Sequence, residues 1–327
     1  MNEPLIYGIG NPLIDIIINA KDKDLNNLGL DKGVMHLVEE KRQKEILSYF
    51  NELMPIYHPG GSAPNTLLAC SAFGINALIT GKIGNDKFGE IYIEQAERFG
   101  VIPALVQGDG PTGSSIIIVT PDGERTMNTH LGMCRYFSKD DLDIEKLSRS
   151  RFLYFTGYMW DTDYQKTAIK TAINFAKENK IKIIFDVADP FVVKRNQEEF
   201  LQIIEKDIDI VFANKSELEI LFNTEDYNIS SSKLGKIVNI AGIKLGKKGS
   251  IVVENNTQTL LPPRPIIAKD STGAGDMYAA GFISSLCKDL GPIEAGKIGG
   301  FVAEEIIQQT GAQLNLNKIK ELSLTLF

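Results

Sequence analysis

The chain has 327 residues, a length that permits one large domain or two of moderate size around a full hydrophobic core. Its composition, 43% hydrophobic and 24% charged, is that of an ordinary globular protein. The formal net charge of −7 argues against a nucleic-acid partner, because contact with many phosphates usually needs a basic face.

The cysteines, histidines and apolar runs bear on the cellular compartment, on zinc binding and on membrane contact. Cys70, Cys134 and Cys287 are far apart and odd in number, which indicates free thiols in a reducing compartment. The 3 histidines show no metal-ligand spacing, so no zinc site is expected. The first residues lack the features of a signal peptide, and no apolar run approaches the roughly 20 residues that span a bilayer. We therefore expect a cytoplasmic protein without membrane contact.

The first third of the chain begins with strand-like segments. Leu5–Ile9 reads as a buried strand, and Ile14–Ile18 as a second one after a proline. Asp86–Phe99 is predicted to be a helix that presents one apolar face and ends at Gly100.

A hairpin follows this helix. Ser114–Thr120 and Arg125–His130 flank Pro121-Asp122-Gly123-Glu124, a sequence typical of a tight turn between antiparallel strands. These strands interrupt the alternation of strands and helices, so we interpret them as part of a small β lid formed from about 13–40 and 107–132.

In the rest of the chain, strand-like and helix-like segments alternate regularly. One helix is predicted at Thr162–Lys180, where alanine and isoleucine recur at helical spacing, and Lys247-Lys248-Gly249 is typical of a tight turn between neighbouring strands. Strand-like apolar runs occur at Phe152–Thr156, Ile181–Val187, Ile208–Ala213, Ile240–Leu245 and Ser250–Val253. This order predicts an α/β fold of three layers, with a mostly parallel sheet covered by helices on both faces.

The segment Asp270-Ser-Thr-Gly-Ala-Gly-Asp276 leads from small residues into an apolar helix. Gly273–Gly275 should therefore lie at a helix N-terminus, where free N–H groups and the helix dipole favour phosphate oxygens. The alternative is that Asp276 merely caps the helix.

A second glycine pair precedes another apolar helix in Pro59-Gly-Gly-Ser-Ala-Pro-Asn-Thr66. Gly60 and Gly61 would expose the backbone at the helix start, and Asn65 would project its amide one turn later. This arrangement suits a polyhydroxylated ligand, although an N-capped loop would have the same pattern.

Together these stretches resemble the paired motifs of the ribokinase-like (PfkB) sugar and nucleoside kinases, and the resemblance extends over about 5–313. The opening is similar to that of adenosine kinases in particular. Further matching segments are Gly10-Asn-Pro-Leu-Ile-Asp15, Gly81-Lys-Ile-Gly-Asn-Asp-Lys-Phe-Gly89, Asn214-Lys-Ser-Glu217 and Gly246-Lys-Lys-Gly249. We expect a single ribokinase-like kinase domain over 1–327.

The resemblance implies the catalytic roles. Asp276 would accept the proton of the acceptor hydroxyl, and the N–H groups of Gly273, Ala274 and Gly275 would form an anion hole. Arg125, just after the hairpin turn, would clamp the donor phosphates when the lid closes; a solvated hairpin arginine is the alternative.

For the acceptor, the resemblance implies that Asp15 binds adjacent sugar hydroxyls, with Gly60, Gly61 and Asn65 completing the contacts. A carboxylate inside the apolar run Leu13–Ile18 supports this role, because burying an unpaired charge is costly.

The nucleotide-binding residues implied by the resemblance are Asn214, Glu217, Gly246, Gly249 and Thr272. Glu217 would act on Mg²⁺ through water, with MgATP as the donor. Asn214 and Glu217 would look similar if they only capped a helix. Many relatives carry a threonine where this chain has Lys244, which puts the detailed adenine and ribose contacts in doubt. A need for a monovalent cation such as K⁺ remains open.

The acceptor is the least determined part. An adenosine-like nucleoside is favoured by the opening motif, and Tyr158, Met159 and Trp160 are candidate walls for the purine, or else core residues. A ribose- or fructose-type sugar is the alternative acceptor, and a non-catalytic sugar or nucleotide sensor the alternative function. The protein is expected to be a monomer or a homodimer paired through the lid, for which the Ile116 and Ile118 face is a candidate surface.

Overall fold

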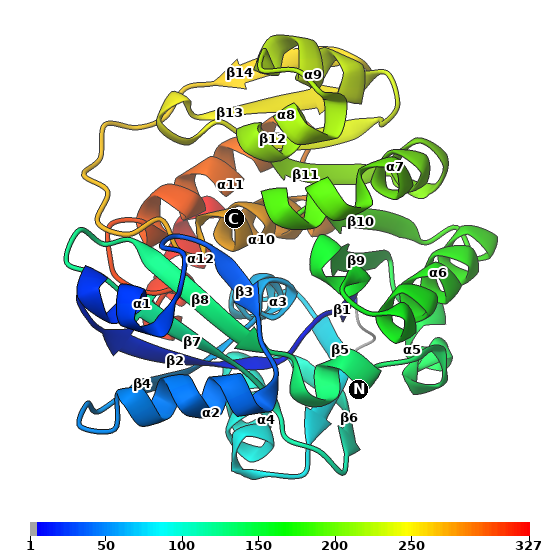
Figure 1. Ribbon diagram of the computed structural model, residues 1–327. Helices are drawn as coiled ribbons and strands as arrows, with labels where there is room; N and C mark the ends of the chain where they lie inside the picture. Colours follow the sequence, from blue (N-terminus) through cyan, green and yellow to red (C-terminus); the bar gives the residue numbers. More distant parts are fainter. Residues whose placement is uncertain (1–4) are drawn as a thin grey trace.

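The apolar runs assemble into one nine-stranded sheet of order β14-β13-β12-β11-β10-β9-β1-β5-β6 (Figure 1). The structure, a computed structural model, describes residues 5–327. Strands from β6 to β12 run parallel, and β13 and β14 extend one edge as antiparallel hairpin strands. The strands are β1 (Ile6–Ile9), β5 (Ala77–Gly84), β6 (Ile102–Gly108), β9 (Phe152–Thr156), β10 (Lys182–Asp186), β11 (Ile210–Asn214), β12 (Ile240–Lys244), β13 (Ser250–Glu254) and β14 (Thr257–Leu261).

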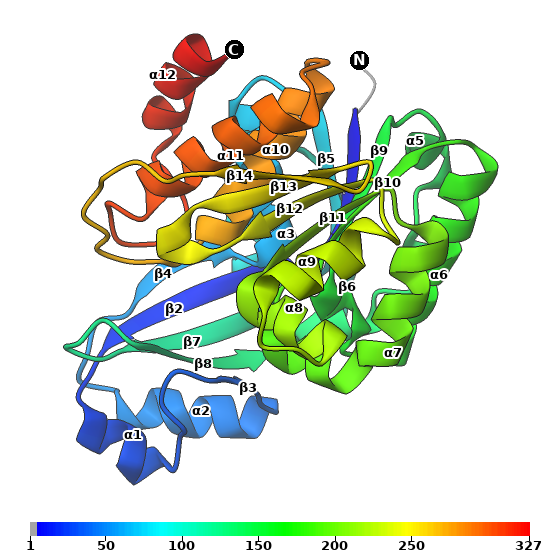
Figure 2. The ribbon, with the colours of Figure 1, turned by 90° about the horizontal axis from the view of Figure 1, so that it is seen from above.

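Helices cover both faces of this sheet, so its strands are apolar on both sides (Figure 2). In β1, for example, Ile6 packs into one core and Tyr7 and Ile9 into the other. One face is covered by α3 (Ser62–Ala72), α4 (Lys87–Phe99), α10 (Ala274–Cys287), α11 (Pro292–Ile306) and α12 (Leu316–Leu326). The other is covered by α5 (Ile144–Ser148), α6 (Asp163–Glu178), α7 (Pro190–Asp207), α8 (Lys215–Phe222) and α9 (Tyr227–Gly235).

The predicted helix boundaries follow from local chemistry. Asp86 caps α4 by accepting a hydrogen bond from the Gly89 N–H, and Gly100 ends it with a φ of 83°. The turn expected after β12 is present as a short 3₁₀ helix that closes the β12–β13 hairpin.

A second, five-stranded sheet has the order β3-β8-β7-β2-β4 and lies beside the large one (Figures 1 and 2). It consists of β2 (Leu13–Asn19), β3 (Met35–Leu37), β4 (Ile56–Gly60), β7 (Gly113–Val119) and β8 (Arg125–His130). The strand β4 was not anticipated, because its segment had been interpreted only as a loop leading into α3.

One expectation about this sheet was wrong. Ile116 and Ile118 are fully buried, because α1 (Asp22–Leu28) and α2 (Glu40–Tyr49) cover that face of the sheet. They share their core with Leu25 and Ile46 of these helices. The face is therefore occupied within the chain and is not a free surface for pairing. Within residues 5–327, no helix combines the length and apolar character that a membrane crossing requires.

Candidate active site

Two helix N-termini that begin with glycine meet at the centre of the molecule. α3 follows Gly61 and α10 follows Gly273, with φ angles of 97° and 74°. A Cβ on Gly61 would lie 2.1 Å from the Asn11 carbonyl oxygen, and one on Gly273 2.3 Å from the Ala312 carbonyl oxygen. Only glycine fits both positions. The start of a helix is where N–H groups lack helical partners, although the Ala274 N–H donates to the Ser271 carbonyl oxygen at 3.2 Å.

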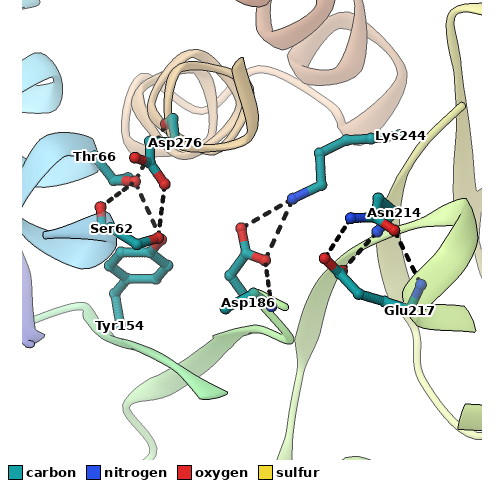
Figure 3. A network of polar contacts seen from close by, with 9 residues as sticks. Ser62, Thr66, Tyr154, Asp186, Asn214, Glu217, Lys244 and Asp276 are labelled. Atoms are coloured by element: carbon teal, nitrogen blue, oxygen red, sulfur yellow. Dashed lines mark hydrogen bonds and ion pairs between the residues drawn. The ribbon is translucent and has the colours of Figure 1, made fainter. Parts of the chain in front are cut away.

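Asp276 lies in the first turn of α10 and is held by α3. The Ser62 hydroxyl donates to its Oδ1 at 2.6 Å (Figure 3). The Asn65 amide donates to its Oδ2 at 3.0 Å. Burial raises its pKa from 3.8 to about 7, although both hydrogen bonds oppose the shift. A carboxyl with this pKa is suited to accept a proton near neutral pH.

Asn65 is in turn fixed by the C-terminal part of the chain. The Gln313 amide donates to Asn65 Oδ1 at 2.8 Å and to the Pro59 carbonyl at 3.0 Å. Asn65 is almost fully buried, so its orientation toward Asp276 is set by these partners.

Asp15 faces the same region from the second sheet. Its Oδ2 would lie 2.3 Å from a Cβ on Gly60, so Gly60 leaves space for this carboxylate. Burial raises the pKa of Asp15 from 3.8 to about 7, opposed by Arg125 and reinforced by Asp276. The structure thus brings Asp15, Gly60, Gly61, Asn65 and Asp276 together.

Arg125 connects the second sheet to the loop before α10. Its guanidinium forms a short ion pair with Asp270, and only 12% of the arginine side chain is exposed. Asp270 also accepts hydrogen bonds from the N–H groups of Thr272 at 3.0 Å and Gly311 at 2.8 Å. Arg125 is therefore a partly buried ion-pair residue and not a solvated hairpin arginine.

A cluster of polar side chains lies at the carboxyl ends of β10, β11 and β12. Asn214 caps α8 and exchanges hydrogen bonds with Glu217 in a capping box. Burial raises the pKa of Glu217 to about 7, opposed by Lys244. Lys244 forms an ion pair with Asp186 at 3.1 Å, with Asp276 on one side and Glu217 on the other (Figure 3). These strand ends are the usual ligand edge of a parallel sheet.

The two remaining nucleotide candidates lie in the β12–β13 turn. Gly246 has a φ of 59° and Gly249 one of 85°, and a Cβ on Gly249 would meet the Leu261 carbonyl oxygen at 2.1 Å. Glycine at these positions is required by the turn itself.

The purine-wall hypothesis for the residues after β9 is wrong for two of its three members. Met159 and Trp160 are both buried in the core, where the Trp160 ring packs against the rings of Phe155, Phe185 and Phe200. Tyr158 is only half-buried. Its pKa is raised mainly by burial, with smaller contributions from the charges of Asp189 and Asp276.

Four residues of the site escaped the sequence reasoning: Ser62, Asp186, Lys244 and Gln313. Ser62 lies inside the second glycine motif, so its place in the motif was available as a signal. Lys244 was noted only as a departure from the family, and Asp186 ends a predicted strand. Gln313 had no signal, because its contact with Asn65 spans 248 residues.

A model of the pfkB family carbohydrate kinases matches residues 54–319 of the chain. The chain belongs to the PfkB family of carbohydrate kinases. An adenosine kinase structure from Sinorhizobium meliloti has a TM-score of 0.92 at 32% identity, with 99% of each chain covered. A probable sugar kinase from Rhizobium etli has the same TM-score of 0.92 at 29% identity, with 100% of each chain covered. An adenosine kinase from Schizosaccharomyces pombe is 24% identical over 343 residues, which cover 97% of this chain and 98% of the relative.

This PfkB-family chain is thus a phosphotransferase with an alcohol group as acceptor, a nucleoside or sugar kinase that uses ATP. The expected architecture, a large mostly parallel sheet between helices with a second small sheet, is confirmed.

Proposed function

We propose that the protein transfers the γ-phosphoryl group of MgATP to the hydroxymethyl group of an adenosine-like nucleoside. Asp15 on the second sheet carries this proposal. Its carboxylate has a raised pKa and accepts no hydrogen bond from residues 5–327, so it is suited to a pair of sugar hydroxyls. The adenosine kinases among the similar proteins support the same acceptor.

An apolar row next to Asp15 offers a place for the base. Ile17, Ile117 and Met127 are paired across β2, β7 and β8, so their side chains share one face of the sheet. Because side chains alternate along a strand, Asp15 lies on the same face as Ile17. A ribose bound at Asp15 would place its purine base against this row. The row would then form the wall of the purine site that the sequence had suggested for Tyr158, Met159 and Trp160.

The transfer follows from the arrangement at α10. Asp276 accepts the proton of the acceptor hydroxyl, whose oxygen forms the new bond to the γ-phosphorus while the bond to the β–γ bridging oxygen breaks and ADP leaves. The N–H groups of Gly273, Ala274 and Gly275 stabilise the charge on the transferring group. Arg125 and the second sheet close over both substrates and exclude water.

The residues near Glu217 fit a magnesium ion that arrives with the nucleotide. Within residues 5–327 no group of three or more ligating side chains could hold a metal by itself. Mg²⁺ commonly keeps several waters and is shared between one or two carboxylates and substrate phosphates. Glu217, a buried carboxylate beside the proposed phosphate site, would hold such an ion through water, and Mg²⁺ would neutralise charge on the phosphates. Asn214, Gly246, Gly249 and Thr272 would complete the nucleotide site.

The test is ADP release from MgATP with adenosine, inosine, guanosine, ribose, fructose or no acceptor, with the Asp276→Asn variant in parallel. Turnover on a nucleoside that the variant lacks would support the proposal. Turnover on ribose or fructose alone would show instead that the acceptor is a free sugar.

A second comparison tests the base site. Met127→Ser should lower kcat/KM for adenosine and leave activity on ribose unchanged. Met54→Ser is the matched control, since Met54 is 96% exposed and lies outside the site. An equal effect of Met127→Ser on both acceptors would contradict the proposed position of the base.

A further inference from the structure

The ammonium group of Lys244 lies next to the backbone of the proposed anion hole. Its Nζ lies 3.3 Å from the position that a Cβ on Gly275 would occupy, so it is adjacent to the backbone at the start of α10. Lys244 is the last residue of β12, and its side chain is 17% exposed. The end of β12 therefore places a positively charged side chain beside the N–H groups at the start of α10.

Asp186 fixes this ammonium group. Asp186 Oδ2 and Oδ1 lie 3.1 and 3.3 Å from Lys244 Nζ, and the carboxylate is only 3% exposed. Among the described residues, Asp186 is the only hydrogen-bond partner of the Lys244 ammonium group. An ammonium has three N–H donors, and one carboxylate uses at most two of them. At least one donor therefore remains for a ligand.

The charged groups around Lys244 favour a phosphate as this ligand. Three carboxyl groups, of Asp186, Glu217 and Asp276, act electrostatically on the lysine. A donor phosphate that approached these groups without a cation would meet net repulsion. A half-buried lysine next to the N–H groups of the proposed anion hole is the arrangement in which a point charge would stabilise a transferring phosphoryl group.

We propose that Lys244 donates a hydrogen bond to the γ-phosphoryl group of the donor nucleotide, and that Asp186 acts as a positioning residue which holds the ammonium in place. The inference rests on the proposed kinase function and adds a cationic residue to it.

A γ-phosphate contact distinguishes ATP from ADP, and this difference is the test. Binding of MgATP and of MgADP, each without acceptor, would be measured by calorimetry for the wild type, Lys244→Met and Lys244→Arg. Lys244→Met should weaken MgATP binding about tenfold or more and change MgADP binding less than about threefold. Its kcat should fall about 10²–10³-fold, the usual effect of losing one donor to the transferring group, and Lys244→Arg should recover part of it.

Lys320→Met is the control, because Lys320 is exposed on α12, away from the site. The double variant Asp186→Asn/Lys244→Met removes both charges, so the test remains valid if Lys244→Met alone fails to fold. If Asp186 acts through Lys244, the double variant should have the same kcat as Lys244→Met.

Two results would overturn the inference. One is equal weakening of MgATP and MgADP binding by Lys244→Met, and the other is a lower Tm with unchanged kcat. Either would make Lys244 a structural counter-ion of Asp186. Failure of the proposed function is separate, since a wild type inert toward every acceptor would still allow the comparison of ATP and ADP binding.

Discussion

Replacing Ser62 by alanine should move the pH dependence of the reaction without disturbing the fold. The Ser62 hydroxyl donates to Asp276 at 2.6 Å, and this hydrogen bond lowers the pKa that burial raises to about 7. Asp276 must be ionised to accept a proton, so kcat/KM should have an acid limb near pH 7. Losing the hydrogen bond disfavours the ionised form and moves this limb to higher pH.

The size of the shift follows from the hydrogen bond. A hydrogen bond to a charged group contributes about 1.5–3 kcal/mol, and water entering the half-buried site would replace part of it. A net loss of about 1.4 kcal/mol corresponds to about one pKa unit. At pH 7 the ionised fraction of Asp276 would fall from about one half to about one tenth, which lowers kcat/KM about fivefold. Above about pH 9 the two proteins should be nearly equal.

The assay is kcat/KM for the acceptor at saturating MgATP between pH 5.5 and 9.5, because this parameter reports ionisation in the enzyme–MgATP complex that binds the acceptor. Ser62→Thr keeps a hydroxyl and serves as the matched control. Asp15 and Glu217 also have pKa values of about 7, so the difference between variant and wild type isolates Asp276. An acid limb that stays in place, or moves to lower pH, would refute the assignment of Asp276 as the base tuned by Ser62.

Further outcomes are expected from other changes. Asp276→Asn should lower kcat about 10²–10⁴-fold while MgATP still binds, as single-turnover and binding measurements would show. Gly60→Ala places a Cβ 2.3 Å from Asp15 Oδ2 and should raise the acceptor KM at least about tenfold, with the KM for MgATP unchanged. The folded-state pKa of Asp15 is raised from 3.8 to about 7, so its charge destabilises the fold increasingly from about pH 4 to 7 and fully above. Asp15→Asn should therefore raise Tm more at pH 8 than at pH 5 in thermal melts, and equal changes at both pH values would contradict the sign. Chelation of Mg²⁺ should abolish turnover and leave Tm unchanged, because the metal is held with the nucleotide.

The features that sequence reasoning predicted well are those encoded within one segment. Gly273–Gly275 predicts the N-terminus of a helix, because the glycines directly precede the apolar run that forms the helix. Asp15 stands out because a carboxylate within an apolar strand needs a partner. The predicted ends of α4 at Asp86 and Gly100 likewise follow from capping, which is local.

The features that were missed depend on contacts between distant segments. Whether Ile116 and Ile118 face solvent or α2 depends on which side of the second sheet the helix packs, which no local pattern states. Trp160 follows a strand, as a site residue often does, yet its indole turns into the core against Phe185. Lys244 looked like a departure from the family until β12 was seen to end beside Gly275.

The first strands of the chain occupy central places in both sheets. β1 lies between β5 and β9 in the large sheet, and β2 lies between β4 and β7 in the second. During synthesis at about 5–20 residues per second, β1 would wait about 7–29 s until β9 is made. Until β9 is made, β1 can pair only with β5 and has no place inside a sheet, so the nascent chain is expected to expose the apolar segment around Tyr7 to chaperones. An N-terminal fusion that slows this late insertion would lower the yield of folded protein while leaving the finished enzyme intact.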